Sequence, residues 1–550
     1  MTVPSEGSPT ARIFIVGEAP GANEVAKGRP FVGASGQLLD NALRKVGISR
    51  SDCFIANVCR ERPPGNDITA WVPTTKKAQA ELLASGDGVM CQGKVVHRFV
   101  ADGLSHLLKE IELVNPDLLI LLGNTPLFFL TGEQGITKWR GSMLRDSRNR
   151  TVVPTLHPAA VLRQWETRIP FEADLRRAVR CLREGWSLPA WNFTVRPTHT
   201  QVTAYLDRLT ECADAGPLLL SCDIETRAGH ISCLGLAPTV TDALCIPFLS
   251  AERPDGYWEL EDEADIVARL QRLLTHPNVE VVGQNFIFDA QYIYRWWRFI
   301  PNLKHDTMLA QHVCFSQAPK SLDYIASLYC DYYKFWKDDG KDWRSIGAGD
   351  EDRYWRYNCE DCVRTLECCR NLRILIDRLN LSEPYAFQID MWLPCLRMMI
   401  RGIDVNLEKR KALIKELKTY ASDCERAIAE MVGYELNPAS SPQMRRFFYE
   451  ELGLPVQIKR GPKGGPSCDD EALGKLAKRC AFIRPLVQTI QGLRSARTLV
   501  ANALKDALGW DGKMHSSFNL AGTHTFRLSS STDAFGSGMN LQNITSGDEE

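Results

Sequence analysis

Residues 217–226 read PLLLSCDIET, an apolar run that ends in two carboxylates separated by one residue. Such a short run is typical of a buried β-strand. Side chains two positions apart project from the same face of a strand, so Asp223 and Glu225 are predicted to point the same way. Two carboxylates aimed together repel each other unless a cation or a proton joins them. The stretch therefore predicts an α/β domain with a metal site.

Two downstream segments supply further oxygen ligands. Residues 279–297, VEVVGQNFIFDAQYIYRWW, predict a strand and then a helix that carries Asp289. Residues 352–379 predict one long helix, in which Tyr357 and Asp361 lie one turn apart on one face. Mg²⁺ prefers oxygen ligands, and two ions about 3.5–4 Å apart can clamp the attacking and departing oxygens of a phosphodiester. The pattern predicts phosphodiester hydrolysis by two Mg²⁺ (or Mn²⁺) ions, with the tyrosine hydroxyl bonded to the attacking water.

Four cysteines in the same predicted helix offer an alternative, because zinc and iron–sulfur clusters favour thiolate ligands. Their spacings do not bring all four onto one face of a helix. Buried structural thiols are therefore the preferred interpretation. The residues are Cys359, Cys362, Cys368 and Cys369.

Composition narrows the class of protein. The chain has 550 residues, 44% of them hydrophobic, and its 66 Lys and Arg balance 67 Asp and Glu to a net charge of −1. This composition excludes wholesale disorder, a collagen-like chain and a coiled coil, and the balanced charge excludes a uniformly basic DNA-wrapping protein. The sequence shows neither a membrane span nor a secretory signal, and its 18 scattered cysteines fit reduced thiols. We predict a cytoplasmic protein without a membrane partner.

The order of elements predicts an α/β multidomain fold. Residues 1–187 alternate apolar strands with helices, as in a Rossmann-like α/β/α domain with a parallel sheet. The polar, proline-containing stretch 188–201 is predicted to be a linker. A second α/β domain is expected over residues 202–380, and long amphipathic helices dominate residues 381–550.

Loops of the first domain form a second candidate site. The loop GEAPG at residues 17–21 follows the first predicted strand, and its glycines would allow the backbone close to a ligand. It lacks the G-x-G-x-x-G spacing of a dinucleotide site. Phe31 lies between turn-forming residues, where its ring could stack on a base. Asn57 ends the strand FIAN, and its amide offers the donor and acceptor that separate uracil from cytosine.

The segments CDIET, QNFIFD and YNCED resemble the three exonuclease motifs of the proofreading domains of family A DNA polymerases, which have an RNase H-like fold. The resemblance implies 3′–5′ exonuclease activity on single-stranded 3′ ends. It also implies that Tyr357 orients the nucleophilic water and that the metal ligands are Asp223, Glu225, Asp289 and Asp361. The alternative is that each acidic pair is an ordinary strand-end or helix-surface feature.

The segments GEAPGANE, GRPFVGASGQLL, IANVCRERPPGN and LHPAAVLR resemble the uracil-DNA glycosylases, in particular the iron–sulfur type called family four. The resemblance implies that Glu18 positions or activates water and that His157 stabilises charge on uracil O2. Asn66 falls on the asparagine of the PPxN segment. By the same resemblance, Phe31 stacks on the flipped uracil, Asn57 reads it, and Leu162 and Arg163 wedge into the duplex.

This chain lacks most of the four cysteines that hold the iron–sulfur cluster in family-four glycosylases. The family holds its cluster with four cysteines, two of which precede the first strand, whereas this chain has none before Cys53. Glu61 replaces another, which leaves Cys91 as a remnant. We therefore predict no iron–sulfur cluster. The alternative for the whole domain is a uracil-binding or purely structural relic.

The last third resembles the thumb and the beginning of the palm of family A polymerases, through SPQMRRFFYEELGLPVQIKRGPKGGPSCDDEALGKLA, IQGLRSARTLVANAL and HTFRLSSSTDAFGSGMNLQNI. The resemblance implies contacts to DNA phosphates, which position DNA without reading its sequence. The phosphate-binding residues would be Lys459, Arg460, Lys463, Arg494 and Arg497, and the primer–template residues Arg527, Asn540, Gln542 and Asn543. A solvated charged surface is the alternative explanation for the basic residues.

In that family the palm carboxylates and the fingers helix follow N-L-Q-N-I, and only TSGDEE follows here. We expect no polymerase activity from this chain alone, and a palm that is either truncated or supplied by a separate chain. The combined resemblance implies replication and repair in a bacterial or phage-infected cell, with primer–template duplex and uracil-containing DNA as partners. The alternative is a non-catalytic DNA-binding and uracil-recognition subunit of a split polymerase.

Overall fold

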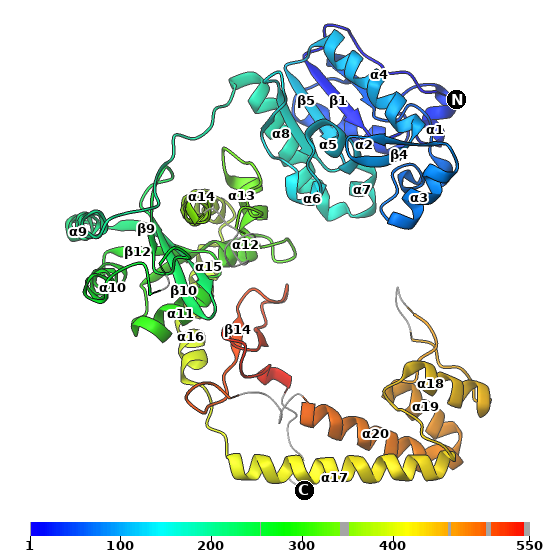
Figure 1. Ribbon diagram of the computed structural model, residues 1–550, viewed down its shortest axis with the longest axis vertical. Helices are drawn as coiled ribbons and strands as arrows, with labels where there is room; N and C mark the ends of the chain where they lie inside the picture. Colours follow the sequence, from blue (N-terminus) through cyan, green and yellow to red (C-terminus); the bar gives the residue numbers. More distant parts are fainter. Residues whose placement is uncertain (1, 254, 341–350, 460–463, 502–507, 544–550) are drawn as a thin grey trace. The chain divides into compact units, whose positions relative to one another are not determined.

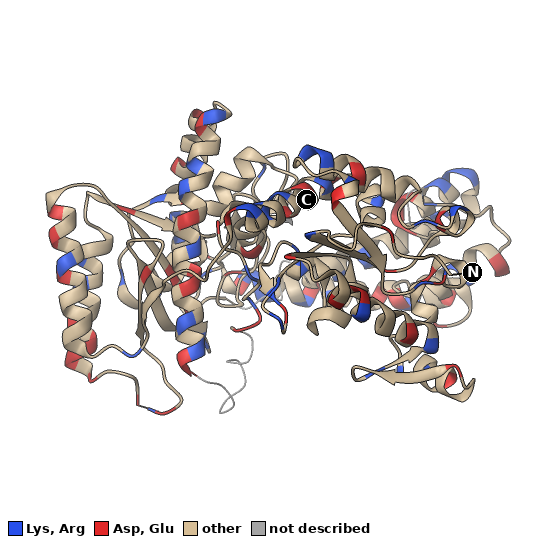
Figure 2. Ribbon diagram, turned by 90° about the horizontal axis from the view of Figure 1, so that it is seen from above, with Lys and Arg blue, Asp and Glu red and all other residues tan. Residues whose placement is uncertain are grey.

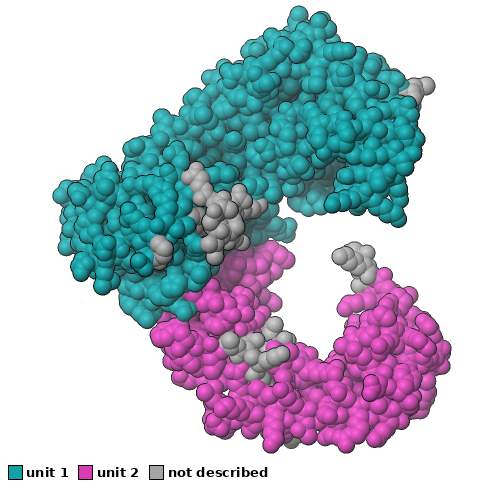
Figure 3. Space-filling model, viewed as in Figure 1, with its two compact units in different colours: residues 1–389 teal, residues 390–550 magenta. Residues whose placement is uncertain are grey.

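The computed structural model describes residues 2–253, 255–340, 351–459, 464–501 and 508–543. Contacts divide the chain into two compact units, Met1–Ile389 and Asp390–Glu550, which Figure 3 shows in two colours. Basic and acidic residues are interspersed along the helices (Figure 2). None of the described helices is long and apolar enough to cross a membrane.

The amino-terminal part of the first unit is built on a five-stranded sheet of order β2-β1-β5-β7-β6 (Figure 1). The strands are β1 (Ile13–Gly17), β2 (Cys53–Asn57), β5 (Leu118–Leu122), β6 (Leu144–Arg145) and β7 (Thr151–Thr155). All pair in parallel except β6 at the edge. Every residue of β1, β5 and β7 is buried, and because alternate residues face opposite sides, both faces of the sheet are covered. The predicted α/β/α layering is confirmed.

Helices and one hairpin surround this sheet. The helix α8 packs on β5 and β7, and α4 packs on β2. The helices are α1 (Ala22–Lys27), α2 (Ala34–Lys45), α3 (Lys76–Ala84), α4 (Arg98–Val114), α5 (Asn124–Thr131), α6 (Ile136–Trp139), α7 (Pro158–Arg163) and α8 (Arg168–Glu184). The hairpin consists of β3 (Gly88–Cys91) and β4 (Lys94–His97).

The second sheet of the first unit has six strands in the order β13-β12-β9-β10-β11-β8. The strands are β8 (Asn192–Thr194), β9 (Leu218–Arg227), β10 (His230–Ala237), β11 (Asp242–Pro247), β12 (Val279–Gly283) and β13 (Leu303–Asp306). β10 is antiparallel to both β9 and β11, whereas β12 runs parallel to β9. The long helix α14 (Glu351–Arg378) packs across β9, β10 and β11. A central strand and one crossing helix thus frame the acidic residues.

The remaining helices of this part are α9 (His199–Ala215), α10 (Leu260–Leu274), α11 (Ile287–Trp297), α12 (Thr307–Cys314), α13 (Leu322–Tyr329) and α15 (Ser382–Asp390). The stretch 188–201, expected to be a linker, contains regular structure. Its residues Asn192–Thr194 form β8, which pairs with β11 at the sheet edge. A three-residue edge strand has few apolar side chains to bury, so its polar composition looks like that of a linker.

The second unit is mainly helical, as predicted. Its helices are α16 (Trp392–Arg401), α17 (Leu407–Val432), α18 (Ser441–Arg445), α19 (Asp470–Arg479) and α20 (Arg484–Leu499), and its strands are β14 (Ser517–Asn519) and β15 (Ser529–Ser531). The helices α17 and α20 pack along each other. The fully buried side chains of Phe448, Leu473 and Ile490 belong to their shared core. The unit comprises Asp390–Glu550.

Buried charged side chains join the two α/β parts of the first unit. Arg140, which follows α6, is 4% exposed and pairs with the fully buried Asp174 of α8. Arg140 also donates to Ser327 Oγ at 2.7 Å, across to α13. Arg177 donates to the carbonyl oxygens of Ser327 at 2.7 Å and Cys330 at 2.9 Å. The network of Arg140, Asp174 and Arg177 is therefore both a core element and a junction between the two parts.

Asp174→Asn should lower the free energy of unfolding of the first unit by about 3–5 kcal/mol, because it leaves two guanidinium groups buried without their counterion. Chemical denaturation followed by tryptophan fluorescence measures the change. The matched control is Asp117→Asn, which breaks the exposed pair with Arg12 and should cost less than about 1 kcal/mol. Equal, small shifts for both variants would contradict the structural role of the network.

Candidate active sites

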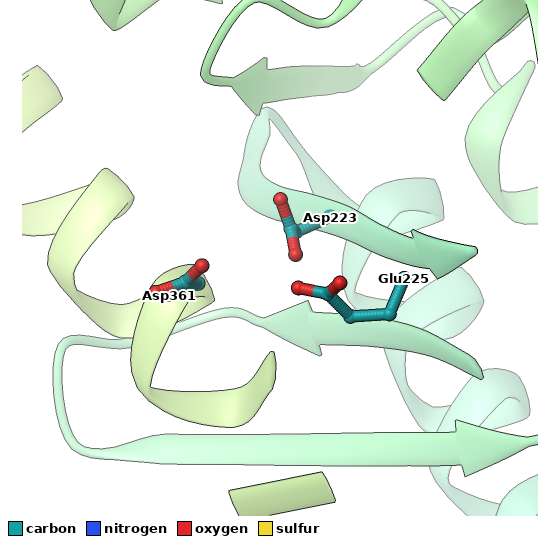
Figure 4. Close-up of side chains that lie close together, drawn as sticks. All are labelled: Asp223, Glu225 and Asp361. Carbon is teal, nitrogen blue, oxygen red and sulfur yellow. The ribbon is translucent and has the colours of Figure 1, made fainter. Parts of the chain in front are cut away.

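The acidic site lies where β9 meets α14. Asp223 and Glu225 project from β9 and Asp361 from α14, and one carboxylate oxygen from each lies within 4.8 Å of the others. Figure 4 shows the three carboxylates turned toward a common space. Alternation along the strand puts the first two on one face, and the packing of α14 on β9 brings the third to them. Within the described residues, these three form the one group of converging metal-ligating side chains.

The fourth predicted acid, Asp289, lies in the first turn of α11 and lines the same cavity. It is not within the 4.8 Å group of three. Its Oδ1 accepts a hydrogen bond at 2.9 Å from the backbone N–H of Ile224, the residue between Asp223 and Glu225 in β9. This bond fixes the Asp289 carboxylate against the strand. Tyr357 also lines this cavity, whose volume is about 520 Å³. The structure thus brings all five predicted residues to one cavity and three of them into mutual contact range.

The segment between α13 and α14 contributes residues that the sequence did not reveal. Trp336 Nε1 donates to Asp361 Oδ1 at 2.6 Å. Lys337 Nζ donates to the Tyr357 hydroxyl at 2.9 Å and forms an ion pair with Asp361. On α14, Asn358 Nδ2 donates to Asp223 Oδ2 at 2.8 Å. Each carboxylate of the pair Asp223 and Asp361 is therefore held in place by a neighbouring donor.

Burial and mutual repulsion shape the electrostatics of the site. Burial, then the charges of Asp289, Asp361 and Glu225, raise the pKa of Asp223 well above its ordinary value. Burial lowers the pKa of Lys337, but the charge and hydrogen bond of Asp361 outweigh it, so the pKa is raised overall. The charged form of a clustered carboxylate is unfavourable without a cation. The donor set, all carboxylate oxygens around a shared cavity, fits a divalent metal such as Mg²⁺.

The cysteines of α14 are part of the core. Cys359 and Cys362 belong to a buried cluster with Cys233 and Cys245 of the sheet, and Cys368 lies 3.6 Å from Cys330, sulfur to sulfur. All four helix cysteines are buried. In the part of the chain that the structure describes, no group of three thiol ligands converges. The structure therefore favours the interpretation as buried structural thiols.

The second candidate site lies at the carboxyl ends of β1, β2 and β7. A Cβ at Gly17 would collide with Asn57 and with the Phe31 ring, so only glycine allows both side chains to approach the end of β1. The ring of Phe31 lies 5.8 Å from that of His157, centroid to centroid. Phe31 is 6% exposed and has a φ of 50°, so it is a strained, buried residue rather than an exposed loop aromatic.

The polar residues of this site are Asn57, Glu18 and Asn66. The Oδ1 atom of Asn57 is buried and, within the described residues, has no hydrogen-bond partner. Glu18 follows β1, and its Oε2 accepts a hydrogen bond from Thr125 Oγ1 at 2.5 Å. Burial raises the pKa of Glu18, with a smaller opposing effect of the Thr125 hydrogen bond. Asn66 is exposed, with a φ of 62°, and its Oδ1 would lie 3.8 Å from a Cβ placed on Gly21.

His157 is held as a neutral donor. It caps α7, and its Nδ1 accepts the backbone N–H of Ala159 at 3.2 Å. A neutral imidazole with an accepting Nδ1 carries its proton on Nε2, which leaves that atom to donate. Burial, then the charge of Arg163, lower the pKa of His157 to about 4. Leu162 and Arg163, the predicted wedge, are both exposed at the end of α7.

Two residues to which the sequence analysis assigned no role, Glu24 and Arg50, hold the Phe31 loop. Glu24 Oε1 accepts the backbone N–H groups of Val32 at 2.9 Å and Gly33 at 2.8 Å. Arg50 donates to the carbonyl oxygens of Phe31 at 3.0 Å and Pro30 at 2.6 Å. Glu24 ends the segment GEAPGANE and Arg50 lies outside the quoted segments, and neither position indicates a contact with the Phe31 loop. Local pattern alone could not have found them.

The cysteines of this domain do not fit a four-cysteine cluster. Cys53 and Cys59 are members of the buried core, and Cys91 in β3 packs against that core. Among the described residues, no three of them converge as ligands. Aromatic rings pack together at the start of α4, with the Trp71 ring 5.5 Å from that of His97 and 5.4 Å from that of Phe99. The absence of a cluster stays a prediction.

The predicted DNA-binding residues of the second unit have mixed surroundings. Arg494 donates to the carbonyl oxygens of Pro438 and Cys468 and pairs with Asp470, so its guanidinium is used inside the unit. Two others are paired on the surface: Arg497 with Glu425 and Lys459 with Asp469. Arg527 is exposed, Gln542 Nε2 donates to Leu528 at 2.7 Å, Asn540 bonds Ser530, and Asn543 ends the 3-10 helix Leu541–Asn543. Arg460 and Lys463 lie outside the described residues.

Family models match three consecutive parts of the chain: uracil DNA glycosylase superfamily over residues 4–183, 3′-5′ exonuclease over 206–377 and DNA polymerase family A over 407–550. The type-4 uracil-DNA glycosylase of Thermotoga maritima is 39% identical over 179 residues, which cover 32% of this chain and 77% of that protein. The chain belongs to the uracil-DNA glycosylase superfamily. To this superfamily domain it joins family A exonuclease and polymerase domains. It is an enzyme of the kind that acts on DNA in replication and repair.

One longer relative matches almost the whole of this chain. The DNA polymerase of Bacillus phage SP01 is 24% identical, and the match covers 96% of this glycosylase-superfamily chain and 62% of the phage protein. A solved structure, the POL domain of Pol1 from M. smegmatis in complex with DNA primer-template and dNTP, is 21% identical with a TM-score of 0.49. That match covers 65% of this chain and 56% of the mycobacterial one.

We expect the imidazole of His157 to stay neutral from pH 8 to pH 5, because its pKa is lowered to about 4. Nitrogen-15 NMR of the labelled protein, followed as pH falls, reports the titration directly. Arg163→Gln should raise the pKa of His157, since it removes a nearby positive charge that opposes protonation. Arg12→Gln, which removes an exposed arginine paired with Asp117, serves as the control and should leave it unchanged. A titration midpoint of His157 near pH 6.5 in the wild type would contradict the burial of its imidazole.

Proposed function

We propose that the exonuclease domain of this protein hydrolyses DNA phosphodiesters from the 3′ end with two divalent metal ions. The convergence of Asp223, Glu225 and Asp361 within 4.8 Å carries this proposal, because a cation offsets the mutual repulsion of such a partly buried acidic group. Asp289 lines the same cavity and would complete the ligand set. When bound, the metal ions would stabilise the charge on the attacking and departing oxygens.

The protein's own side chains orient the reactants. The Tyr357 hydroxyl, held by Lys337 at 2.9 Å, orients the nucleophilic water by a hydrogen bond. Asn358 and Trp336 fix the carboxylates of Asp223 and Asp361 by donating to them. A cavity of about 520 Å³ is within the range of small-ligand sites, roughly 300–1,000 Å³, which is large enough for a terminal nucleotide.

The amino-terminal domain excises uracil from DNA in this proposal. The specific observation is the buried, unpartnered Oδ1 of Asn57, an acceptor matched to the N3–H of uracil and mismatched to the N3 acceptor of cytosine. Phe31 would stack on the extruded base beside it, and His157 Nε2 would donate to O2, where charge develops as the base leaves. Glu18, in its carboxylate form, would position the water that attacks the sugar.

DNA binding by the second unit is the third part of the proposal. Arg527 is exposed and Arg163 of the first unit is exposed, so both can reach a phosphate without losing a described ion pair. Lys459 and Arg497 would have to exchange their acidic partners for phosphates, which costs little for exposed pairs. Arg494 positions loops inside the unit and is not proposed as a phosphate contact.

Asp223→Ala should slow the shortening of single-stranded DNA by about 1000-fold, equivalent to about 4 kcal/mol of lost transition-state stabilisation, because metal binding fails. Removal of divalent ions with a chelator should have the same effect on the wild type. End-labelled oligonucleotides and time-resolved gels measure both. Glu261→Gln, an exposed acid in the first turn of α10, is the control and should be fully active. Shortening that persists in Asp223→Ala would remove the exonuclease assignment.

Asn57→Ala should reduce uracil excision about 5- to 150-fold, because the buried edge of the base loses its partner at a cost of about 1–3 kcal/mol. Uracil-containing duplexes are incubated with the protein, and alkali then cleaves the abasic sites. Asn41→Ala, at an exposed position of α2, should have no effect. Tight binding to uracil-containing DNA without strand breaks would favour the non-catalytic, recognition-only alternative for this domain.

A further inference from the structure

One residue that lines the cavity of the exonuclease site comes from the glycosylase-like domain. Lys138 of α6 lines it together with the acids of β9 and α14. The domain that carries Lys138 and the domain that carries the acids belong to the same compact unit. Sequence motifs assign no role to Lys138, which is 80 or more residues from every acid of the site.

Docking of the two domains fixes the position of Lys138. Its backbone carbonyl oxygen accepts the hydroxyl of Tyr333 at 3.3 Å. The backbone N–H of Met143 donates to the carbonyl oxygen of Tyr333 at 2.7 Å, and that of Phe335 donates to Ser142 Oγ at 3.1 Å. Arg140, which follows α6 directly, adds a hydrogen bond to Ser327 Oγ, and Arg177 donates to the carbonyl oxygen of the same residue. The backbone of α6 is therefore held against the exonuclease domain on several sides.

The docked segment continues into the catalytic residues. Phe335 is buried in the core of the glycosylase-like domain, with its ring 5.5 Å from that of Trp139. The next two residues, Trp336 and Lys337, contact Asp361. One short stretch of chain thus has its first half in one domain and its second half in the acidic site of the other. The position of α6 relative to the acids follows from this continuity.

Acidic residues outnumber basic ones in the lining of the cavity, and Lys138 is one of the basic residues. Asp223, Glu225, Asp289, Asp323 and Asp361 line the cavity, and Lys138 and Lys337 are the cations among its described lining residues. Lys337 is committed to Asp361 and Tyr357. The side chain of Lys138 is 44% exposed and lies 3.5 Å from an exposed carboxylate, that of Asp338. An exposed pair of this kind is weak, so a phosphate can displace the carboxylate.

We propose that Lys138 of the glycosylase-like domain binds a phosphate of the DNA strand in the exonuclease cavity, so that the exonuclease site is complete only with this domain docked. The proposal rests on the exonuclease function proposed above. An ammonium at the rim offsets the repulsion between the acids and the DNA backbone. It acts on binding of the strand, away from the reacting atoms.

The test uses the full chain and a single-stranded oligonucleotide in Mg²⁺. Lys138→Ala should raise KM about 5- to 10-fold and leave kcat within about twofold, and Lys138→Glu should raise KM further. The slope of log KM against log salt should fall by about 0.7, the value for one lost phosphate contact on single strands. Lys138→Arg should restore both quantities. Lys109→Ala, an exposed lysine of α4, is the matched control.

A purely structural role of the pair with Asp338 predicts a different pattern. If the pair only stabilised docking, Asp338→Asn and Lys138→Ala would weaken the enzyme in the same direction. In our proposal, Asp338→Asn lowers KM because it removes the competing carboxylate, whereas Lys138→Ala raises KM. Equal KM values for Lys138→Ala and Lys109→Ala, with normal thermal unfolding, would overturn the proposal. In that outcome, if Asp223→Ala alone abolished activity, the exonuclease assignment would stand and only the role of Lys138 would be refuted.

Discussion

Repulsion among converging, partly buried carboxylates is the constraint on which the exonuclease site of the first unit depends. Asp223, Glu225 and Asp361 come within 4.8 Å of one another on two elements that pack face to face, so the site stores unfavourable charge whenever no cation is bound. Neighbouring hydrogen-bond donors and one lysine reduce this electrostatic repulsion. Lys337 supplies a counter-charge to Asp361, and Asn358 supplies a neutral donor to Asp223. A site of this kind is stable only where the rest of the fold holds it rigidly.

That rigidity depends on the junction between the two α/β domains. Arg140 and Arg177 are buried among groups from both domains, and Asp174 neutralises part of their charge. Removing charges from water is costly, and such a cost is tolerated when the geometry gains specificity. Here the junction fixes the segment that contains Phe335 and Lys337, of which one end is a core residue and the other a neighbour of the acids. Folding of one domain is thereby coupled to the chemistry of the other.

Local periodicity explains what the sequence could predict. The strand period of two placed Asp223 and Glu225 on one face, and the helix period placed Tyr357 and Asp361 together, so the sheet, the long helix and the acidic site were all accessible. Lys337 and the other residues of the irregular segment between α13 and α14 have no period and depend on tertiary packing. The edge strand β8 lies inside the stretch predicted to be a linker, and its three residues, of which Phe193 alone is apolar, are too few to show a period of two. Asp289 was expected among the converging acids, but its bond to the backbone of β9 holds it to one side.

Backbone and polar strain in the glycosylase-like domain argue for a working site rather than a relic. Phe31 has a φ of 50°, a conformation that costs a bulky residue about 1–3 kcal/mol, and Asn57 buries an oxygen without a partner, which costs a similar amount. Glu24 and Arg50 are used to hold the strained loop. A domain that served only as a scaffold for the exonuclease would be more stable with neither cost. Both are accounted for if a planar base with an N–H donor binds against Phe31 and Asn57, because the ring then gains a stacking partner and the oxygen gains its hydrogen bond.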